Sequence, residues 1–290
     1  MGKKSKKKNK RRLKKTMSIR NAANRQSPAP RVEVSKDLMP QGGNEDRRLL
    51  TTMTKEIYML ARLHYDLLDS EKIHRVFLKL HCMQHDPFRD RWVWLYEAEA
   101  KRLKFKGTYK DIPIERRPIV LGAFFFRNNG EMVLDLNSFD RAIKAVVFFD
   151  KYLPRKAAKV KDITVLNKFH DGSKGFIPKH QDYFDKGLEE VIDPNGLIND
   201  LKRVTSTIEN PMEKINAAYP RMMEEFQKSI PEVERMPIHF YEDGISSLKG
   251  RLSLREIIAM QHWQGNSDYS FNNVFEEILP LIPPLPKPEE

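Results

Sequence analysis

Residues 118–150, with the sequence PIVLGAFFFRNNGEMVLDLNSFDRAIKAVVFFD, carry the strongest structural signals in the chain. The continuous apolar run 119–126 is long enough for a strand that is buried on both faces. Asn129-Gly130 favours a two-residue hairpin turn, because both positions of that turn need a positive φ angle. Met132, Leu134 and Leu136 then alternate with Glu131, Val133 and Asp135, which is the period of a strand. This stretch therefore predicts a β-hairpin.

The hairpin is followed by signals for one long helix and a third strand. Ser138 is a favourable N-cap, and Pro154 cannot continue a helix, so the helix is expected between them. Residues 160–166 are apolar enough for another strand. A helix that returns the chain to the same sheet makes a right-handed crossover. The predicted unit is a small mixed sheet built from a hairpin, a helix and a strand.

A helical layer is expected in front of this unit, over residues 49–106. Apolar residues recur at helical spacing over 57–68 and again over 70–83, where Ser70 is a candidate N-cap. A third helix is expected over 87–103, because Asp86-Pro87 combines an N-cap residue with a proline at the first helical position.

After residue 186 the chain is acidic, and its sequence pattern predicts mainly helices. Asp193-Pro194 and Asn210-Pro211 again combine an N-cap residue with a proline at the first helical position. The end is rich in proline. The predicted fold class is α+β, with a helical layer, a small mixed sheet and a helical C-terminal part. The predicted divisions are 1–46 (tail and linker), 47–186 (helical layer and sheet) and 187–290 (C-terminal part).

Composition excludes several classes of protein. The chain has 290 residues, of which 40% are hydrophobic, so it can build a core. A single cysteine, Cys82, excludes a disulfide scaffold and a four-cysteine zinc module. The sequence has no run of about 18 apolar residues, and its basic start is not followed by the apolar segment of a secretory signal. We therefore expect an intracellular protein without a membrane span, either cytoplasmic or associated with the nucleoid, or nuclear in a eukaryote.

The net charge of +12 is concentrated in the first 31 residues. They hold 13 Lys and Arg and no acidic residue, so they should be disordered when free. The body is nearly neutral but divided, with a net charge of +8 over 89–186 and −8 over 187–290.

The tail has the composition of a segment that binds the phosphates of a nucleic acid. Each Lys or Arg on a phosphate releases condensed counterions, which gives an affinity that depends on salt but not on base sequence. The tail residues predicted to make such contacts are Lys3, Lys4, Lys6, Lys7, Lys8, Lys10, Arg11, Arg12, Lys14 and Lys15.

The body offers a second set of candidate contacts. Exposed aromatic rings stack on unpaired bases, and lysines bind phosphates. Trp94 lies off the expected apolar stripe of the third helix, so it is predicted to be exposed. The predicted phosphate contacts of the body are Lys156, Lys159, Lys161 and Lys174.

Three histidines are the strongest candidates for a metal site. His74, His81 and His85 would lie within about 40° of one another if all three were on the second predicted helix. Imidazole nitrogens suit zinc and other transition metals. No His-Glu-x-x-His motif is present, and core histidines with satisfied ring nitrogens are the alternative interpretation.

The sequence favours a non-enzymatic protein that binds nucleic acid, RNA ahead of DNA, as a component of a larger complex. It needs no cofactor in this interpretation. Two alternatives stay open. One is a metal-dependent hydrolase or nuclease, and the other is a protein-interaction adaptor whose acidic C-terminal part docks a basic protein.

Overall fold

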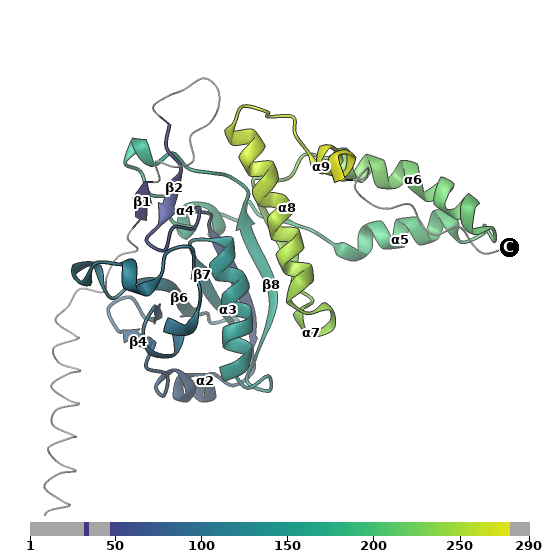
Figure 1. Cartoon of the computed structure of the whole chain (residues 1–290). Coiled ribbons are helices and arrows are strands. Elements are labelled where there is room, and N and C mark those ends of the chain that lie inside the picture. The colour runs from purple at the N-terminus through teal and green to yellow at the C-terminus, as the bar shows by residue number, and fades with distance from the viewer. Residues whose placement is uncertain (1–31, 35–46, 279–290) are drawn as a thin grey trace, which may run out of the picture.

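The computed structural model describes residues 32–34 and 47–278, and it shows an α+β fold around one eight-stranded sheet (Figure 1). Every neighbouring pair of strands is antiparallel except β10 with β9. A separate two-stranded sheet pairs β1 (Val32–Val34) with β2 (Leu50–Thr52). The spatial order in the large sheet is β4 (Met83–Asp86), β5 (Arg91–Leu95), β6 (Val120–Phe126), β7 (Glu131–Leu136), β3 (Ala61–Leu67), β8 (Ala158–Leu166), β10 (Val233–Pro237) and β9 (Glu190–Val191).

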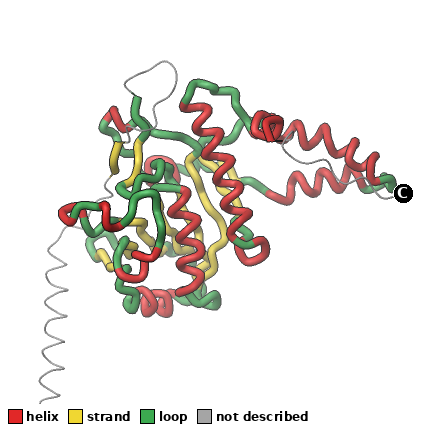
Figure 2. The backbone as a smooth tube through the Cα atoms, in the orientation of Figure 1, coloured by secondary structure: helices red, strands yellow, loops and turns green. Residues whose placement is uncertain are grey.

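Helices cover the sheet and extend beyond it (Figure 2). The helices are α2 (Ser70–Phe77), α3 (Phe139–Tyr152), α4 (His180–Phe184), α5 (Pro194–Thr205), α6 (Pro211–Gln227), α7 (Phe240–Asp243), α8 (Ile245–Trp263) and α9 (Phe271–Ile278). Short 3₁₀ turns are η1 (Ala98–Arg102), η2 (Tyr109–Asp111), η3 (Ile114–Arg116) and η4 (Gly172–Lys174). In Figure 1, α3 and α8 lie side by side across one face of the sheet, whereas α5 and α6 project away from the body as an arm.

The structure confirms the predicted hairpin and the helix that follows it. Strands β6 and β7 pair in antiparallel register, but the predicted two-residue turn is wrong. Arg127 N–H donates to the carbonyl oxygen of Glu131 at 2.8 Å, so residues 128–130 connect the strands. Gly130 has a φ angle of 76°, whereas Asn129 does not have a positive φ angle.

The side chain of Ser138 accepts a hydrogen bond from the backbone N–H of Arg141 at 3.1 Å, so it is the N-cap of α3. The helix ends before Pro154, as expected.

The sheet is larger than the predicted one because β3 lies between the two strands that α3 connects. The third predicted strand is confirmed as β8. Strands β7 and β8 are both antiparallel to β3, so they are parallel to each other and α3 is a crossover between them. The strand that fills the gap comes from a segment more than 60 residues before α3 in the chain.

The predicted N-terminal helical layer is wrong in two of its three helices. Residues 61–67 form the strand β3, and the segment predicted as the third helix contains β5, which pairs with β4. Only α2 is confirmed, and it ends at Phe77. Its N-cap is Asp69, whose side chain accepts a hydrogen bond from the N–H of Lys72 at 2.9 Å, and not Ser70.

The two wrong helices share a physical explanation. In β3 the residues Ala61, Leu63 and Tyr65 alternate with the polar residues Arg62, His64 and Asp66, which is the period of a strand. The same segment also places apolar residues at helical spacing, and sequence alone does not separate the two periods in a short run. Hydrogen-bonded pairing with β7 and β8, which come later in the chain, stabilises the strand over the helix.

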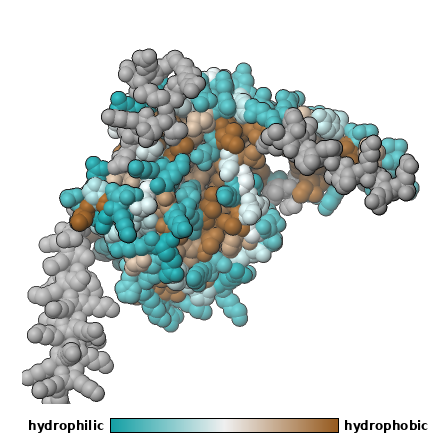
Figure 3. Space-filling model, viewed as in Figure 1, coloured by the Kyte–Doolittle hydropathy of each residue, from teal (hydrophilic) through white to brown (hydrophobic). Residues whose placement is uncertain are grey.

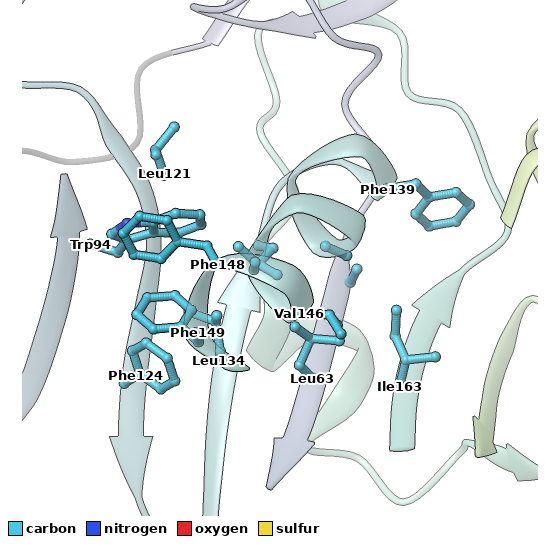
Figure 4. Close-up of a cluster of buried hydrophobic side chains, with 14 of the residues drawn as sticks. Leu63, Trp94, Leu121, Phe124, Leu134, Phe139, Val146, Phe148, Phe149 and Ile163 are labelled. Carbon is cyan, nitrogen blue, oxygen red and sulfur yellow. The ribbon is translucent and has the colours of Figure 1, made fainter. Parts of the chain in front are cut away.

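Aromatic side chains of α3 form the centre of the core (Figure 4). The ring of Phe149 lies 4.7 Å from the ring of Phe124 on β6 and 4.9 Å from Trp94 on β5. Phe148 lies 5.2 Å from Trp94. Aromatic pairs at these separations stabilise a core beyond their area of burial. The packing fixes α3 across the middle of the sheet.

The C-terminal part belongs partly to the sheet and partly to the arm. Helices α5 and α6 begin at Pro194 and Pro211, as predicted. Strand β10 pairs with β8, and the buried Arg255 of α8 donates to Glu234 of β10 at 2.9 Å. Strands of residues 187–278 therefore extend the sheet formed by residues 47–186, and the division at residue 186 stays a prediction.

We predict that Gly122→Ala destabilises the protein by about 1–3 kcal/mol, the usual cost of added volume in a packed core. A Cβ atom at this position in β6 would lie 2.7 Å from the carbonyl oxygen of Asp135 and 2.7 Å from Cδ2 of Leu136. The measurement is urea denaturation. Gly250→Ala is the control, because a Cβ there has no neighbour within 4 Å and alanine favours the helix. Equal midpoints for Gly122→Ala and the wild type would contradict the tight packing of β6 on β7.

Candidate functional site

Three of the predicted lysines lie together on the surface. Lys156 is in the turn after α3, and Lys159 and Lys161 are in the first half of β8; all three are exposed. Lys161 is the extra residue of a β-bulge opposite β3, and its Nζ lies 3.6 Å from a carboxylate oxygen of Asp66. Lys156 and Lys159 form no ion pair with any residue that the structure describes. We call Lys156, Lys159 and Lys161 the lysine edge.

Lys174 lies at the other end of β8. It is in the turn η4, whose Gly172 donates a hydrogen bond to the carbonyl oxygen of Arg48 at 2.7 Å. Since β8 has nine residues, its two ends are about 27 Å apart at roughly 3.3 Å per residue. Lys174 is exposed but is not part of the lysine edge.

The prediction that Trp94 is exposed is wrong. Its side chain is fully buried on β5, between the rings of α3 described above. Neighbouring Trp92 and Tyr96 are buried too, so the strand is covered on the side of the helices. Trp94 therefore stabilises the core and offers no stacking surface for a base.

The predicted histidine stripe is also wrong, because α2 ends before two of its members. His74 stacks on Phe126 with ring centres 4.2 Å apart. His81 follows the helix, and its Nδ1 lies 3.1 Å from Oε1 of Glu99, whereas His85 is on β4. Within residues 47–278, no three His, Cys, Asp or Glu side chains are grouped as metal ligands. The transition-metal alternative stays a hypothesis without a located site.

The predicted tail contacts, from Lys3 to Lys15, lie outside the described residues. The first residue described after the tail and linker is Arg47, whose guanidinium lies 3.8 Å above the ring of Trp263 at the end of α8. The basic segment 1–31 is followed directly by β1, which pairs with β2, so this two-stranded sheet is the first described contact of the chain with the body.

A charged network that the sequence does not predict lies on the face of the sheet opposite α3. The buried Arg62 of β3 donates to Asp135 of β7 at 2.5 and 3.0 Å and to Asp185, which follows α4, at 2.5 Å. Burial opposes the charge of Arg62, but the hydrogen bonds to the two carboxylates outweigh it and raise the pKa of its guanidinium. Arg127 adds a second contact to Asp185 at 3.0 Å. These ion pairs hold α4 on the sheet.

A second part of this network has the order carboxylate, imidazole, hydroxyl. Nδ1 of His64 lies 2.7 Å from Oε1 of Glu131, and Nε2 lies 2.8 Å from Oγ1 of Thr164. The hydroxyl of Thr164 donates to Glu189 at 3.0 Å. A hydrolase uses this order of groups around a nucleophile that the substrate can reach. Here Thr164 is 0% and His64 5% exposed, so the arrangement is structural.

Electrostatics support the structural role of His64. Burial lowers the pKa of its imidazole, and the positive charge of Arg235 lowers it further, against the opposing effect of Glu131. Arg235 itself donates to Asp162 at 2.8 Å and lies 3.4 Å from Glu131. The one sequence signal for this network is the alternation of charged residues on β3, which a helical interpretation conceals.

The comparisons with known proteins find no relative from which a role for these residues could be inferred. No protein-family model matches the sequence, no curated protein is similar to it, and no solved structure matches the fold. In the described part of the chain, every helix is too short or too polar to cross a bilayer.

We predict that the titration of His64 lowers the free energy of unfolding as the pH falls. Its folded-state pKa lies below the unfolded value of about 6.5, so the unfolded state binds the proton first. The contribution of neutral His64 is present above about pH 6.5 and is lost below it, at no more than about 1.4 kcal/mol per pH unit. Urea denaturation at pH 7, 6 and 5 should therefore show a smaller loss for His64→Gln than for the wild type.

Part of the loss should persist in His64→Gln because of a second histidine. Burial, with the charge of Lys168, lowers the pKa of His170 to about 4. His170→Gln should remove that second part. Identical pH dependences for the wild type and His64→Gln would show that His64 is not buried in its neutral form.

Proposed function

We propose that this protein binds nucleic acid without chemical turnover, with RNA preferred, as a component of a larger complex. The observation that carries the proposal is the lysine edge, where Lys156 and Lys159 are exposed and form no ion pair with the described residues. A cation without an acidic partner keeps its full charge for a phosphate. The basic tail supplies most of the charge, and the lysine edge extends the contact onto the folded body.

RNA is proposed ahead of DNA because of where the lysines are. Reading duplex DNA in its major groove takes a helix or a β-ribbon that enters the groove. The lysine edge lies on a turn and on a strand inside a wide sheet. Phosphate contacts from such a surface suit irregular or single-stranded RNA, whose backbone is not confined to a regular groove.

We predict that deletion of residues 2–31 lowers the salt dependence of RNA binding by several units of slope. Each lost phosphate contact removes about 0.7 from the slope of log K on log salt for a single strand. Lys156→Glu/Lys159→Glu should lower the slope by about 1.4 and leave the melting temperature unchanged, since exposed lysines add little stability. Fluorescence anisotropy of labelled single-stranded RNA across a salt titration measures both effects.

The matched control is Lys202→Glu/Lys214→Glu, which makes the same change of charge on the arm. Both lysines are exposed on α5 and α6, away from the lysine edge. An equal loss from the control pair would mean that overall charge, and not the lysine edge, governs binding. A tail-free protein without affinity for RNA at low salt would exclude the body from the interface.

The arm favours a second candidate function, protein interaction. No described side chain of α5 or α6 is buried, and three apolar side chains of α6 are more than half exposed. Figure 3 shows hydrophobic surface on the arm. These are Met212, Ile215 and Tyr219, which lie on one face of the helix at spacings of three and four residues. These three side chains stay more than half exposed although α6 packs against α5 and α9, so we propose that this face binds a partner.

A second copy of the chain fits this face. An antiparallel contact of two α6 helices centred on Ala217 sets Ile215 opposite Tyr219 and Glu213 opposite Arg221 of the other copy. Residues 194–227 hold four basic and five acidic side chains, so two arms repel each other little. Docking of a basic protein on the acidic C-terminal part stays a separate prediction.

We predict a dimer in solution that Ile215→Glu converts to a monomer, because the substitution places a charge in the centre of the contact. Light scattering after size-exclusion chromatography measures the mass. Lys214→Glu lies on the other side of α6 and should leave the dimer intact. A monomeric wild type at tens of micromolar concentration would overturn this contact.

A further inference from the structure

An aromatic side chain is exposed in the loop that joins β8 to α4, over residues 167–179. Phe176 is 59% exposed, and its neighbour Ile177 is 41% exposed. Within the part of the chain that the structure describes, the ring of Phe176 contacts no other aromatic ring and no cation. Single apolar side chains are common on protein surfaces, so this exposure becomes informative only through its surroundings.

Hydrogen bonds on both sides of the exposed segment fix its backbone. Before it, the N–H of Gly172 donates to the carbonyl oxygen of Arg48 at 2.7 Å. After it, the hydroxyl of the buried Tyr58 donates to the carbonyl oxygen of Pro178 at 2.9 Å. Residues 173–177 are thus held as a short projection on the surface. A ligand that binds this projection orders few further residues, which lowers the entropic cost of binding.

Two lysines flank the exposed ring in the chain. Lys174 is two residues before Phe176 and Lys179 is three residues after it, and both are exposed. Neither forms an ion pair with any residue that the structure describes. The nearest acidic residues in the chain, Asp171 and Asp182, accept hydrogen bonds from backbone N–H groups at 2.9 and 3.0 Å. Sites for single-stranded nucleic acid combine an aromatic ring that stacks on a base with cations that bind the backbone.

The basic segment of the chain ends next to this loop. Its last basic residue, Arg31, directly precedes β1 in the sequence. Strand β1 pairs with β2, and both strands lie against η4, the turn that contains Lys174. RNA bound by the basic segment would therefore be held near Phe176. Linking two contacts in this way raises the effective concentration of the RNA at the second one.

We propose that Phe176 stacks on one unpaired base of a single-stranded RNA, while Lys174 and Lys179 contact phosphates on either side of that base. Phe176 then takes the role that the sequence predicted for the buried Trp94. The inference rests on the proposed function and adds to it a site that distinguishes unpaired bases from paired ones. In a duplex each base face is covered by the next base pair, whereas the bases of a single strand can be splayed out.

The test compares Phe176→Ala with Phe88→Ala in the full chain. Phe88 is the matched control, because it is 83% exposed in the turn between β4 and β5 and is followed by the exposed Arg89. Strand β4 lies five positions from β8 in the sheet, which is about 24 Å at roughly 4.8 Å per strand. Both rings are exposed, so neither change should lower the melting temperature.

Binding is measured by fluorescence anisotropy with labelled octauridylate and with a fully paired duplex RNA. Phe176→Ala should weaken octauridylate binding about fivefold or more without changing the salt slope, because it removes stacking but no charge. Phe176→Tyr keeps the ring and should bind as the wild type does. Duplex affinity should not change, and Phe88→Ala should leave both affinities unchanged. Lys174→Gln should lower the slope by about 0.7.

Phe176→Trp gives a direct readout of stacking. The three native tryptophans are all buried, so the added fluorescence comes from an exposed ring. Octauridylate should quench the fluorescence of Phe176→Trp more than that of the wild type. Phe88→Trp, which also adds an exposed ring, should show no such additional quenching.

The outcomes separate this inference from the function on which it rests. If the wild type binds no RNA, the proposed function fails. If the wild type binds octauridylate and Phe176→Ala binds it equally well, stacking on Phe176 is excluded and the proposed function stands. An equal loss for octauridylate and duplex, the same loss in Phe88→Ala, or unquenched fluorescence in Phe176→Trp would also overturn the inference, because each shows that this ring does not contact an unpaired base.

Discussion

The packing of α3 across the sheet is the constraint on which the other features of the molecule depend. Its rings Phe148 and Phe149 lie against Trp94 and Phe124, and its two ends lead to β7 and β8. Those strands are parallel and leave a gap one strand wide, which β3 fills. Because only one side of β3 faces α3, its other side is free to carry Arg62 and His64.

The sequence predicts the elements whose signals are local and misses those whose partners are distant. The hairpin over β6 and β7 has its turn residues within the stretch, and α3 has its cap at Ser138. β3 satisfies two periods at once, and the choice between them is made by pairing with residues 131–136 and 158–166. The same ambiguity over β5 explains the wrong prediction that Trp94 is exposed. The predicted single helix for His74, His81 and His85 is wrong because α2 ends at Phe77.

The candidate sites also divide into those with local sequence signals and those formed by residues that are distant in the chain. Lysines near the start of β8 are visible in the sequence, because charge and exposure go together. A cavity of about 310 Å³ between the ends of β8 and α8 cannot be predicted in this way, because Asn167 and Trp263, which both line it, are almost a hundred residues apart in the chain. The acidic residues and the histidine on the sheet face opposite α3 are of types that catalytic sites use. Because Thr164 and His64 are buried, we assign this group to stabilising the fold.

Phosphate contacts from two parts of the chain would act together in the proposed function. Phosphate contacts by the tail and the lysine edge are long-ranged, independent of base and weakened by salt. The two sets differ in how they are held, because Lys159 and Lys161 lie on β8, which pairs with β3 on one side and β10 on the other. On this proposal, affinity would come mainly from the charge of the tail, and the lysine edge would fix where the RNA lies on the body.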